Sequence, residues 1–231
     1  MIRLFVSVDL AAGSEIRLDE KQHHYVLHVM RLHVGEKILL FNGRDGLWQG
    51  LFQQLDKKAA RVLLQEQIQA QTPLEGADLY MAVIKKEAMD LVVQKAVELG
   101  VRSIHPVLCA RSVVSRINRE RLQQIAVEAA EQSERLNVPV VLPAVSLTQA
   151  VSDVASDTAL AFLNERGQNT GELKRGQSVA FFIGPEGGWT PAEIQLMGAH
   201  PRAVSVHLGQ TILRAETAAM VALSCYAFDI F

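Results

Sequence analysis

The sequence predicts an α/β protein in which a small, mainly β domain precedes a mostly parallel sheet covered by helices. Short strand patterns fill the first part of the chain, and a polar stretch carrying Pro73 and Gly76 follows. From there to the end, strand patterns alternate with helix patterns. Such alternation indicates parallel strands, because each crossover connection carries a helix onto a face of the sheet. We therefore expect domains at residues 1–70 and 78–231, joined by a linker at 71–77.

Composition sets the class of protein. The chain has 231 residues, of which 49% are hydrophobic and 21% are charged, which is typical of a globular fold and not of a disordered chain. Its net charge of -2 means that any contact with RNA must come from a local patch. Cys109 and Cys225 lie too far apart for a zinc motif and fit a reducing compartment. No apolar run suits a signal peptide or a membrane span, so we expect a cytoplasmic protein. The spacing of the cysteines and histidines also leads us to expect no bound metal.

The first domain shows several strand patterns around one helix. Asp19 to Met30 suits the helix, and the residues from Asn42 to Gly46 form a turn with two glycines. The polar run from Gln65 to Ala77 is the best linker candidate. The strands are expected at Ile2–Val8, Lys37–Asn42, Leu47–Leu55 and Ala59–Leu64.

The second domain follows a strand–helix rhythm. Gly100 suits the residue just past a helix end, and Asn118 suits an N-cap. Strands are expected at Leu79–Ile84, Ser103–Leu108, Thr158–Leu163, Ser178–Ile183 and Ala203–His207, with helices at Glu87–Leu99, Asn118–Ser133 and Leu213–Phe228.

The most informative segment runs from Phe181 to Ile194, where a buried strand pattern leads into a glycine-rich loop and then a helix. Thr190 and Glu193 form a capping box with Pro191 at the first helical position, which fixes the helix start. Glycines allow a ligand to approach the backbone. The loop has neither the dinucleotide-binding nor the Walker A spacing. A simple tight turn explains it equally well.

A second loop of this kind runs from Leu208 to Ala218. Here a strand end is followed by Gly209 and then by an apolar helix that carries Arg214 and Glu216 at its head. Charges in such a place are costly unless they are paired or functional, and a structural ion pair is the simpler explanation. Both loops are expected at the carboxyl edge of one parallel sheet, which is where open α/β folds bind ligands.

These two segments together resemble the paired signature of the RsmE family of SPOUT RNA methyltransferases. The resemblance extends over nearly the whole chain in the same order. Further matching segments are His28–Leu32, Gln94–Val101, and Ala130–Ser133 with Val138–Pro139.

The resemblance implies several properties beyond what the residue patterns predict. The fold would be a SPOUT domain whose chain end forms a trefoil knot, preceded by a PUA-like β-barrel for RNA. The reaction would be methylation of N3 of a uridine in the 16S rRNA of the small ribosomal subunit. The last helix, with its apolar stripe of Met220, Leu223 and Phe228, would lie near a homodimer interface. S-adenosylmethionine would bind mainly to backbone groups of Leu163, Ile183, Gly184, Pro185, Glu186, Gly187, Gly188, Leu208, Gly209, Ile212 and Leu213.

RNA contacts are expected at His28, Arg31, Arg111 and Arg135. The family usually has Gly-Arg-Asn-Arg where this chain has Glu134-Arg135-Leu136-Asn137, so only one of the two arginines carries over. Arg111 belongs to the clearest basic stretch, Arg102 to Arg121. A solvated helix face remains the alternative for the later arginines of that stretch, and a packed histidine remains the alternative for His28.

Arg214 is the candidate catalytic cation, because loss of the N3 proton leaves a uridine anion that a cation stabilises. Glu216 is expected to hold Arg214 or to order the loop. Three other functions stay open: a SPOUT enzyme that modifies tRNA, a non-catalytic RNA-binding assembly factor, and a nucleotide-binding α/β enzyme. The missing phosphate-loop spacings weaken the last of these.

Overall fold

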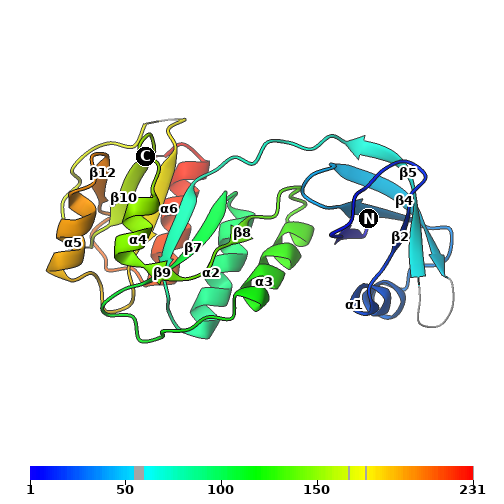
Figure 1. Ribbon diagram of the computed structural model, residues 1–231, viewed down its shortest axis with the longest axis horizontal. Coiled ribbons are helices and arrows are strands. Elements are labelled where there is room, and N and C mark those ends of the chain that lie inside the picture. The colour runs from blue at the N-terminus through cyan, green and yellow to red at the C-terminus, as the bar shows by residue number, and fades with distance from the viewer. Residues whose placement is uncertain (55–59, 166, 175, 231) are drawn as a thin grey trace. The chain divides into compact units, whose positions relative to one another are not determined.

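The computed structural model describes residues 1–54, 60–165, 167–174 and 176–230 (Figure 1). The chain divides into two compact units, each described by itself below. The first holds Met1–Leu74 together with Ala130–Val138, and the second holds Glu75–Ala129 and the chain from Pro139 onward. A linear division of the sequence did not anticipate that residues 130–138 group with the N-terminal unit.

The first unit is built on a five-stranded sheet. β1 pairs with β3 in parallel and the other pairs are antiparallel. Alternate residues of β5 such as Val62 and Leu64 point into a core with Ile38, Leu40 and Phe52. The strands, in the order β1-β3-β4-β5-β2, are β1 (Arg3–Phe5), β2 (Glu15–Arg17), β3 (Lys37–Phe41), β4 (Leu47–Gln54) and β5 (Ala60–Gln69).

A short helix changes type halfway along. α1 (Glu20–His24) begins at Asp19, whose carboxylate accepts from the backbone of Gln22 in a capping box, as the expected helix start requires. It continues as a single turn of π-helix, η1 (Tyr25–Val29). Just beyond it, Arg31 has a φ of 54°, which is rare for a residue with a side chain. Such features often accompany functional segments.

The prediction that Gln65–Ala77 forms a linker was wrong in its first part, because β5 extends to Gln69. The residues from Gln65 onward are exposed on this strand, so they show no hydrophobic alternation. They pair with β4, and the Gln49 amide donates a 3.1 Å hydrogen bond to Glu66. Of the expected strand ends, Leu55 and Ala59 lie outside the described residues.

The second unit is built on a sheet in which every described strand pair is parallel, which confirms the predicted α/β class. The strands are β6 (Asp78–Ala82), β7 (Ser103–Leu108), β8 (Val140–Val141), β9 (Val145–Ser146), β10 (Ala159–Leu163), β11 (Val179–Ile183) and β12 (Ala203–Val206). Their order is β12-β10-β11-β6-β7-β8, with β9 also beside β7.

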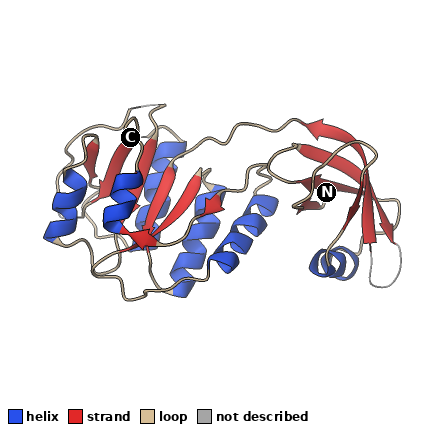
Figure 2. Ribbon diagram, viewed as in Figure 1, coloured by secondary structure: helices blue, strands red, loops and turns tan. Residues whose placement is uncertain are grey.

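Helices cover both faces of this sheet (Figure 2). α4 and α5 pack on the face that carries Tyr80 and Phe182, whereas α2 and α6 lie on the opposite face, where Phe181 meets Tyr226. Asn118 caps α3 by accepting from the backbone of Arg121 at 2.9 Å, as predicted. The helices are α2 (Lys86–Glu98), α3 (Arg119–Gln132), α4 (Leu147–Asp153), α5 (Pro191–Gly198) and α6 (Ala215–Ala227).

A polar cluster fixes the amino ends of β6 and β7. Asp78 accepts hydrogen bonds from Nε and Nη2 of Arg102, which lie on one edge of the guanidinium, and from the Ser103 hydroxyl. Ser103 Oγ also lies 2.7 Å from Nε2 of His105. Burial acts to raise the pKa of Asp78, but the hydrogen bonds from Arg102 and Ser103 outweigh it, so the pKa lies below its usual value.

Cys109 and Cys225 are free thiols, and both are half-buried. Within the described ranges, no helix is both long enough and apolar enough to cross a membrane. The trefoil knot is not tested by these elements and stays a prediction from the resemblance.

Candidate functional site

A cavity of about 480 Å³ opens in the second unit, where the chain leaves the carboxyl ends of β10, β11 and β12. Every residue that the resemblance implied for cofactor binding lines it: Leu163, Ile183, Gly184, Pro185, Glu186, Gly187, Gly188, Leu208, Gly209, Ile212 and Leu213. The structure therefore brings the two glycine-bearing loops together at one edge of the sheet, as expected for parallel strands. The cavity is within the usual size range for small-molecule sites.

The first loop, residues 184–189, contains a tight turn. The Gly188 N–H donates to the Pro185 carbonyl at 2.8 Å, and Gly188 has a φ of 68°, which a residue with a side chain adopts only at a cost. Thr190 then starts α5 with the predicted capping box to Glu193, and Pro191 occupies the first turn. The sequence prediction for this helix start is confirmed.

Trp189 holds the loop from the β10 side. Its ring is almost buried, and its indole N–H donates to the Leu163 carbonyl at 2.8 Å. A Cβ on Gly184 would lie 3.1 Å from Cε2 of this ring, so the indole leaves no room for a side chain there. Trp189 was not among the predicted site residues, although an aromatic residue directly after two glycines was a signal for it.

Glu193 holds the loop from the β7 side. Its side chain is buried, with an exposed fraction of 8%. One carboxylate oxygen accepts from the Ala110 N–H at 2.8 Å, and the other accepts from the backbone and hydroxyl of Thr190 at 2.7 and 2.9 Å. A residue expected only to cap its own helix therefore also binds the chain that follows β7.

Arg111 lies at the same place. It lines the cavity, and its Nη1 donates to the carbonyl oxygens of Gly187 at 2.9 Å and of Trp189 at 3.3 Å. A Cβ on Gly187 would lie 3.1 Å from Cβ of Arg111. The arginine that was expected to contact RNA thus packs directly on the glycine loop.

The second loop leads into α6. Arg214 is the N-cap residue of this helix, is exposed, and lines the cavity. Glu216 lies in the first turn of α6, is half-buried, and does not line the cavity. Among the described side chains no ion pair joins Arg214 to Glu216, so the expected holding role of Glu216 gains no support.

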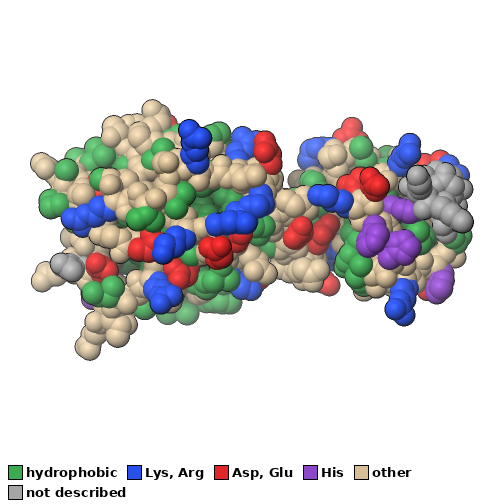
Figure 3. Space-filling model, turned by 90° about the horizontal axis from the view of Figure 1, so that it is seen from below, with side chains coloured by type: hydrophobic (Ala, Val, Ile, Leu, Met, Phe, Trp, Pro, Cys, Tyr) green, Lys and Arg blue, Asp and Glu red, His purple; other side chains and the backbone are tan. Residues whose placement is uncertain are grey.

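The basic stretch from Arg102 to Arg121 is largely engaged within the protein. Arg102 pairs with Asp78 and Arg121 with Asp90, so neither arginine forms the open basic surface that RNA phosphates require. Figure 3 shows that, on one face of the second unit, lysines and arginines are interspersed with acidic side chains.

Histidines gather on the first unit (Figure 3), and the rings of His24 and His28 lie 4.9 Å apart. His28 and Arg31 are both exposed. Arg135 is different, because it is half-buried and burial lowers its pKa to about 10. Within the part of the chain that the structure describes, no group of three or more His, Cys, Asp or Glu side chains is placed to hold a metal ion.

Asn137 stands where the resemblance led us to expect an arginine. Its amide donates to the carbonyls of Thr72 at 3.3 Å and of Pro73 at 3.1 Å, and its oxygen accepts from Gln71. The side chain therefore ties residues 71–73 to residues 130–138 within the first unit.

Comparisons with known proteins agree with this architecture. Residues 70–227 match the family described as RNA methyltransferase domain, and residues 18–65 match the family described as RNA methyltransferase PUA domain. The ribosomal RNA small subunit methyltransferase E of Rickettsia conorii is 32% identical over 96% of this chain and 93% of its own length. The protein of the same name from Synechocystis is 34% identical over 96% of this chain and 76% of its own length.

Two solved structures are similar over nearly their whole length. A ribosomal RNA small subunit methyltransferase E of Neisseria gonorrhoeae bound to S-adenosyl methionine has a TM-score of 0.88 and 30% identity, and the match covers 97% of this chain and 96% of that one. A putative methyltransferase of Legionella pneumophila with bound SAM has a TM-score of 0.89 and 29% identity, covering 99% and 97%. Two glycine loops on one cavity, the domain matches and these relatives together show that the chain belongs to the ribosomal RNA small subunit methyltransferase E family of RNA methyltransferases.

Proposed function

We propose that this protein transfers a methyl group from S-adenosylmethionine to N3 of a uridine in the 16S rRNA of the small ribosomal subunit. The cavity at the two glycine loops carries the proposal, because one pocket joins the backbone groups that suit a methyl donor to an exposed arginine. The relatives crystallised with S-adenosylmethionine support the donor, and the names of the curated relatives support the RNA.

The lining of the cavity fits the donor. Both loops present glycine backbone and aliphatic side chains, with Ile183 and Leu163 at the strand ends, so backbone groups and apolar contacts are available to an adenosine and a methionine moiety. We propose the lining residues from Leu163 to Leu213 named above as the donor site. When bound there, S-adenosylmethionine supplies an electrophilic methyl group.

Arg214 is the residue proposed to stabilise the uridine that accepts the methyl group. The N3 atom of uridine carries a proton, which passes to solvent as the methyl group leaves the sulfonium, and loss of this proton leaves negative charge on the base. The Arg214 guanidinium lies at the cavity, and within the described residues no hydrogen bond or ion pair engages it. A cation in that position would stabilise the uridine anion, and a base held at the cavity would be positioned for transfer. Glu216, in the first turn of the helix that Arg214 caps, is proposed to order the loop.

The decisive experiment uses small subunits from a strain that lacks the gene. The purified protein is incubated with these subunits and labelled S-adenosylmethionine, and the labelled nucleotide is identified by mass spectrometry. Label on uridine N3 is expected. Label on a ribose 2′-hydroxyl, label on tRNA but not on the subunit, or no binding of S-adenosylmethionine by the wild-type protein would overturn the proposal.

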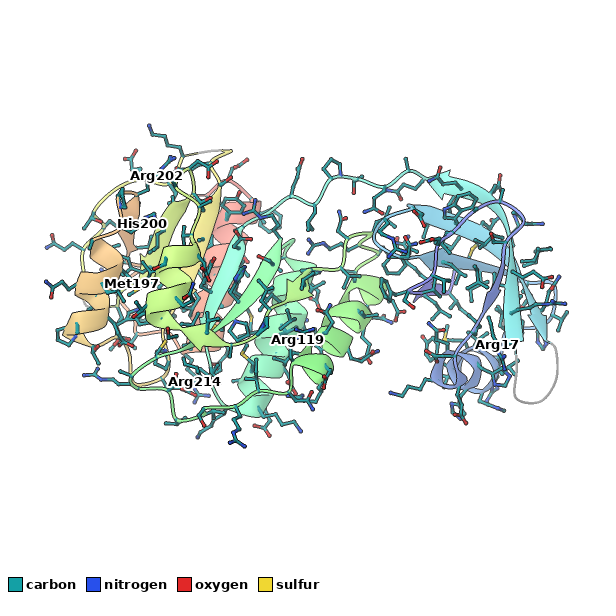
Figure 4. All side chains as sticks on the ribbon, in the orientation of Figure 1. Arg17, Arg119, Met197, His200, Arg202 and Arg214 are labelled. Atoms are coloured by element: carbon teal, nitrogen blue, oxygen red, sulfur yellow. The ribbon has the colours of Figure 1, made fainter. Side chains whose placement is uncertain are left out.

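A matched pair of variants tests the role of Arg214. Arg214→Ala is expected to keep the affinity for S-adenosylmethionine and to lose about a hundredfold or more in kcat, which is a typical cost of removing one charge-stabilising group. Arg202→Ala is the control, because Figure 4 shows Arg202 and Arg214 at opposite edges of the unit and Arg202 binds the Asp157 carbonyl. An Arg214→Ala protein that methylates at the original rate would remove the assignment.

The first unit supplies the RNA contacts in this proposal. His28 and Arg31 are exposed beside the π-helical turn, and we propose them as contacts, with residues 1–70 as the RNA-binding domain, 71–77 as the linker and 78–231 as the catalytic domain. Arg135 is a weaker candidate, because a half-buried guanidinium presents less of its fork to a phosphate.

We also propose that the protein works in the cytoplasm as a homodimer with α6 at the interface. Phe228, at the end of α6, is 69% exposed, whereas Leu223 of the expected stripe is buried in the core of its own unit. Ile230 is also exposed, and the proposal takes these apolar side chains at the end of α6 to be covered by a second copy of the chain. Sedimentation equilibrium of the wild-type protein and of Phe228→Ser tests this, and a monomeric wild-type protein would exclude it.

A further inference from the structure

The connection between β7 and α3, residues 109–118, is fastened to the glycine loop at two points. The backbone N–H of Ala110 donates to the buried Glu193 carboxylate at 2.8 Å. The guanidinium of Arg111 donates to the Gly187 and Trp189 carbonyls. Two adjacent residues of one connection thus hold both ends of the segment 187–193, which contains the last residues of the turn at 185–188 and the start of α5.

The fit between Arg111 and Gly187 is steric as well as polar. A Cβ on Gly187 would meet Cβ of Arg111 at 3.1 Å and Cδ at 3.4 Å. The aliphatic stem of the arginine therefore lies against the glycine, while its Nη1 reaches the carbonyls beyond. Arg111 is exposed, but its Nη1 is already engaged by these two carbonyls and is not free to join a phosphate in the two-pronged manner of an arginine fork, so this geometry is that of a clamp on the loop.

We propose that Arg111 is a positioning residue for the methyl-donor loop. It holds the carbonyls of Gly187 and Trp189, so that the turn at 185–188 keeps its shape before the donor arrives. Pre-formed loops bind more tightly because they lose less conformational freedom on binding. The inference rests on the proposed function, since it takes the glycine loop to be the donor site.

Glu193 is the second half of this clamp. Its carboxylate accepts from Ala110 on one oxygen and from Thr190 on the other, and it is removed from water. Glu193→Gln keeps the shape but turns one acceptor into an amide donor that faces a backbone N–H. This change weakens one side of the clamp without opening a cavity.

The test measures the affinity for S-adenosylmethionine by calorimetry without RNA. Arg111→Met keeps the stem over Gly187 and removes the donors, and its Kd is expected to rise about thirtyfold, the cost of losing two hydrogen bonds of ordinary net strength. Arg111→Lys, which retains one donor group, should recover part of this loss. Arg116→Met is the matched control, because Arg116 is an exposed arginine of the same connection that does not line the cavity, and its Kd should equal that of the wild type.

Steady-state kinetics separate a positioning role from a general loss of stability, because only the positioning role predicts a change in KM without a change in kcat. With Arg111→Met the KM for S-adenosylmethionine is expected to rise, while kcat at saturating donor stays within about twofold, because a residue that only shapes the donor loop loses donor binding and not transition-state stabilisation. If the affinity for S-adenosylmethionine is unchanged and binding to small subunits falls with a shallower salt dependence, Arg111 is a phosphate ligand and the inference is overturned.

Two further outcomes are distinguishable. If circular dichroism shows that Arg111→Met does not fold, Glu193→Gln decides in its place: a weaker affinity for the donor supports the clamp, and an unchanged affinity overturns it. A wild-type protein that fails to bind S-adenosylmethionine ends the proposed function, whereas equal binding by the wild type and Arg111→Met ends only the clamp.

Discussion

The indole N–H of Trp189 donates a 2.8 Å hydrogen bond to the carbonyl oxygen of Leu163 and so joins the glycine loop to the end of β10. Trp189→Phe keeps an aromatic ring against Gly184 but removes this donor. The lost bond should cost about 1 kcal/mol, which corresponds to a roughly fivefold rise in the Kd for S-adenosylmethionine measured by calorimetry. Equal affinity in the two proteins would show that the ring alone shapes the loop.

Gly184 and Gly198 should respond to alanine in opposite directions. In Gly184→Ala the new methyl group lies 3.1 Å from the Trp189 ring, so the ring must shift and stability should fall by about 1–3 kcal/mol. In Gly198→Ala nothing lies within 4 Å of the new methyl group at the end of α5, and stability should rise by about 0.5–1 kcal/mol. Urea unfolding of both variants checks the signs, and a stabilised Gly184→Ala would contradict the close approach.

The Asp78–Arg102 pair should make stability depend on acid pH. The folded pKa of Asp78 is below its usual value, so its carboxylate contributes stability that is fully present above the unfolded pKa and is lost as the pH falls through the folded pKa. Asp78→Asn should therefore cost about 2 kcal/mol near neutral pH, and the difference from wild type should shrink in acid.

Urea unfolding from about pH 6 down to about pH 3 measures this difference. Asp9→Asn is the control, because the Asp9 side chain is 94% exposed and its pairing with Arg44 should be worth little at any pH. A cost for Asp78→Asn that stays constant over the whole range would show that the carboxylate contributes through its shape and not through its charge.

Arg31 allows charge to be separated from backbone conformation. With φ at 54°, glycine at this position relieves strain of about 1 kcal/mol, whereas alanine does not. Both Arg31→Gly and Arg31→Ala remove the cation, so both should weaken binding to small subunits and lower the slope of affinity against salt by about 1. Only the glycine variant should be at least as stable as wild type. Weaker binding by the alanine variant alone would assign the effect to conformation.

Local chemistry made the helix starts predictable. Each cap depends on residues no more than three positions apart, as in Thr190 with Glu193 and in Asn118, so a short stretch of sequence contains the whole signal. The π-helical turn after His24 carries no such signal, because its residues suit an α-helix equally well. The end of β5 was missed because its exposed, polar residues show no alternation.

The candidate site also has one part that the sequence predicted and another part that it did not. The glycine loops were found because their residue types recur in a known family, and the parallel sheet brings the strand ends to one edge. The contacts that shape the loops were not found, since Arg111 reaches Gly187 across 76 positions and Ala110 reaches Glu193 across 83. A single sequence contains no record of such pairs, and only the folded chain reveals them.

Cys109 precedes Ala110 in the chain, so the reactivity of its thiol can report on the contact between Ala110 and Glu193. Burial, with the nearby Glu193 adding to it, raises the pKa of the Cys109 thiol to about 12, so the sulfur stays protonated and slow to react at neutral pH. Any excursion that lifts residues 109–111 away from Glu193 would hydrate this sulfur and speed its alkylation. In a Cys225→Ser background, the alkylation rate would then measure how often residues 109–111 leave Glu193.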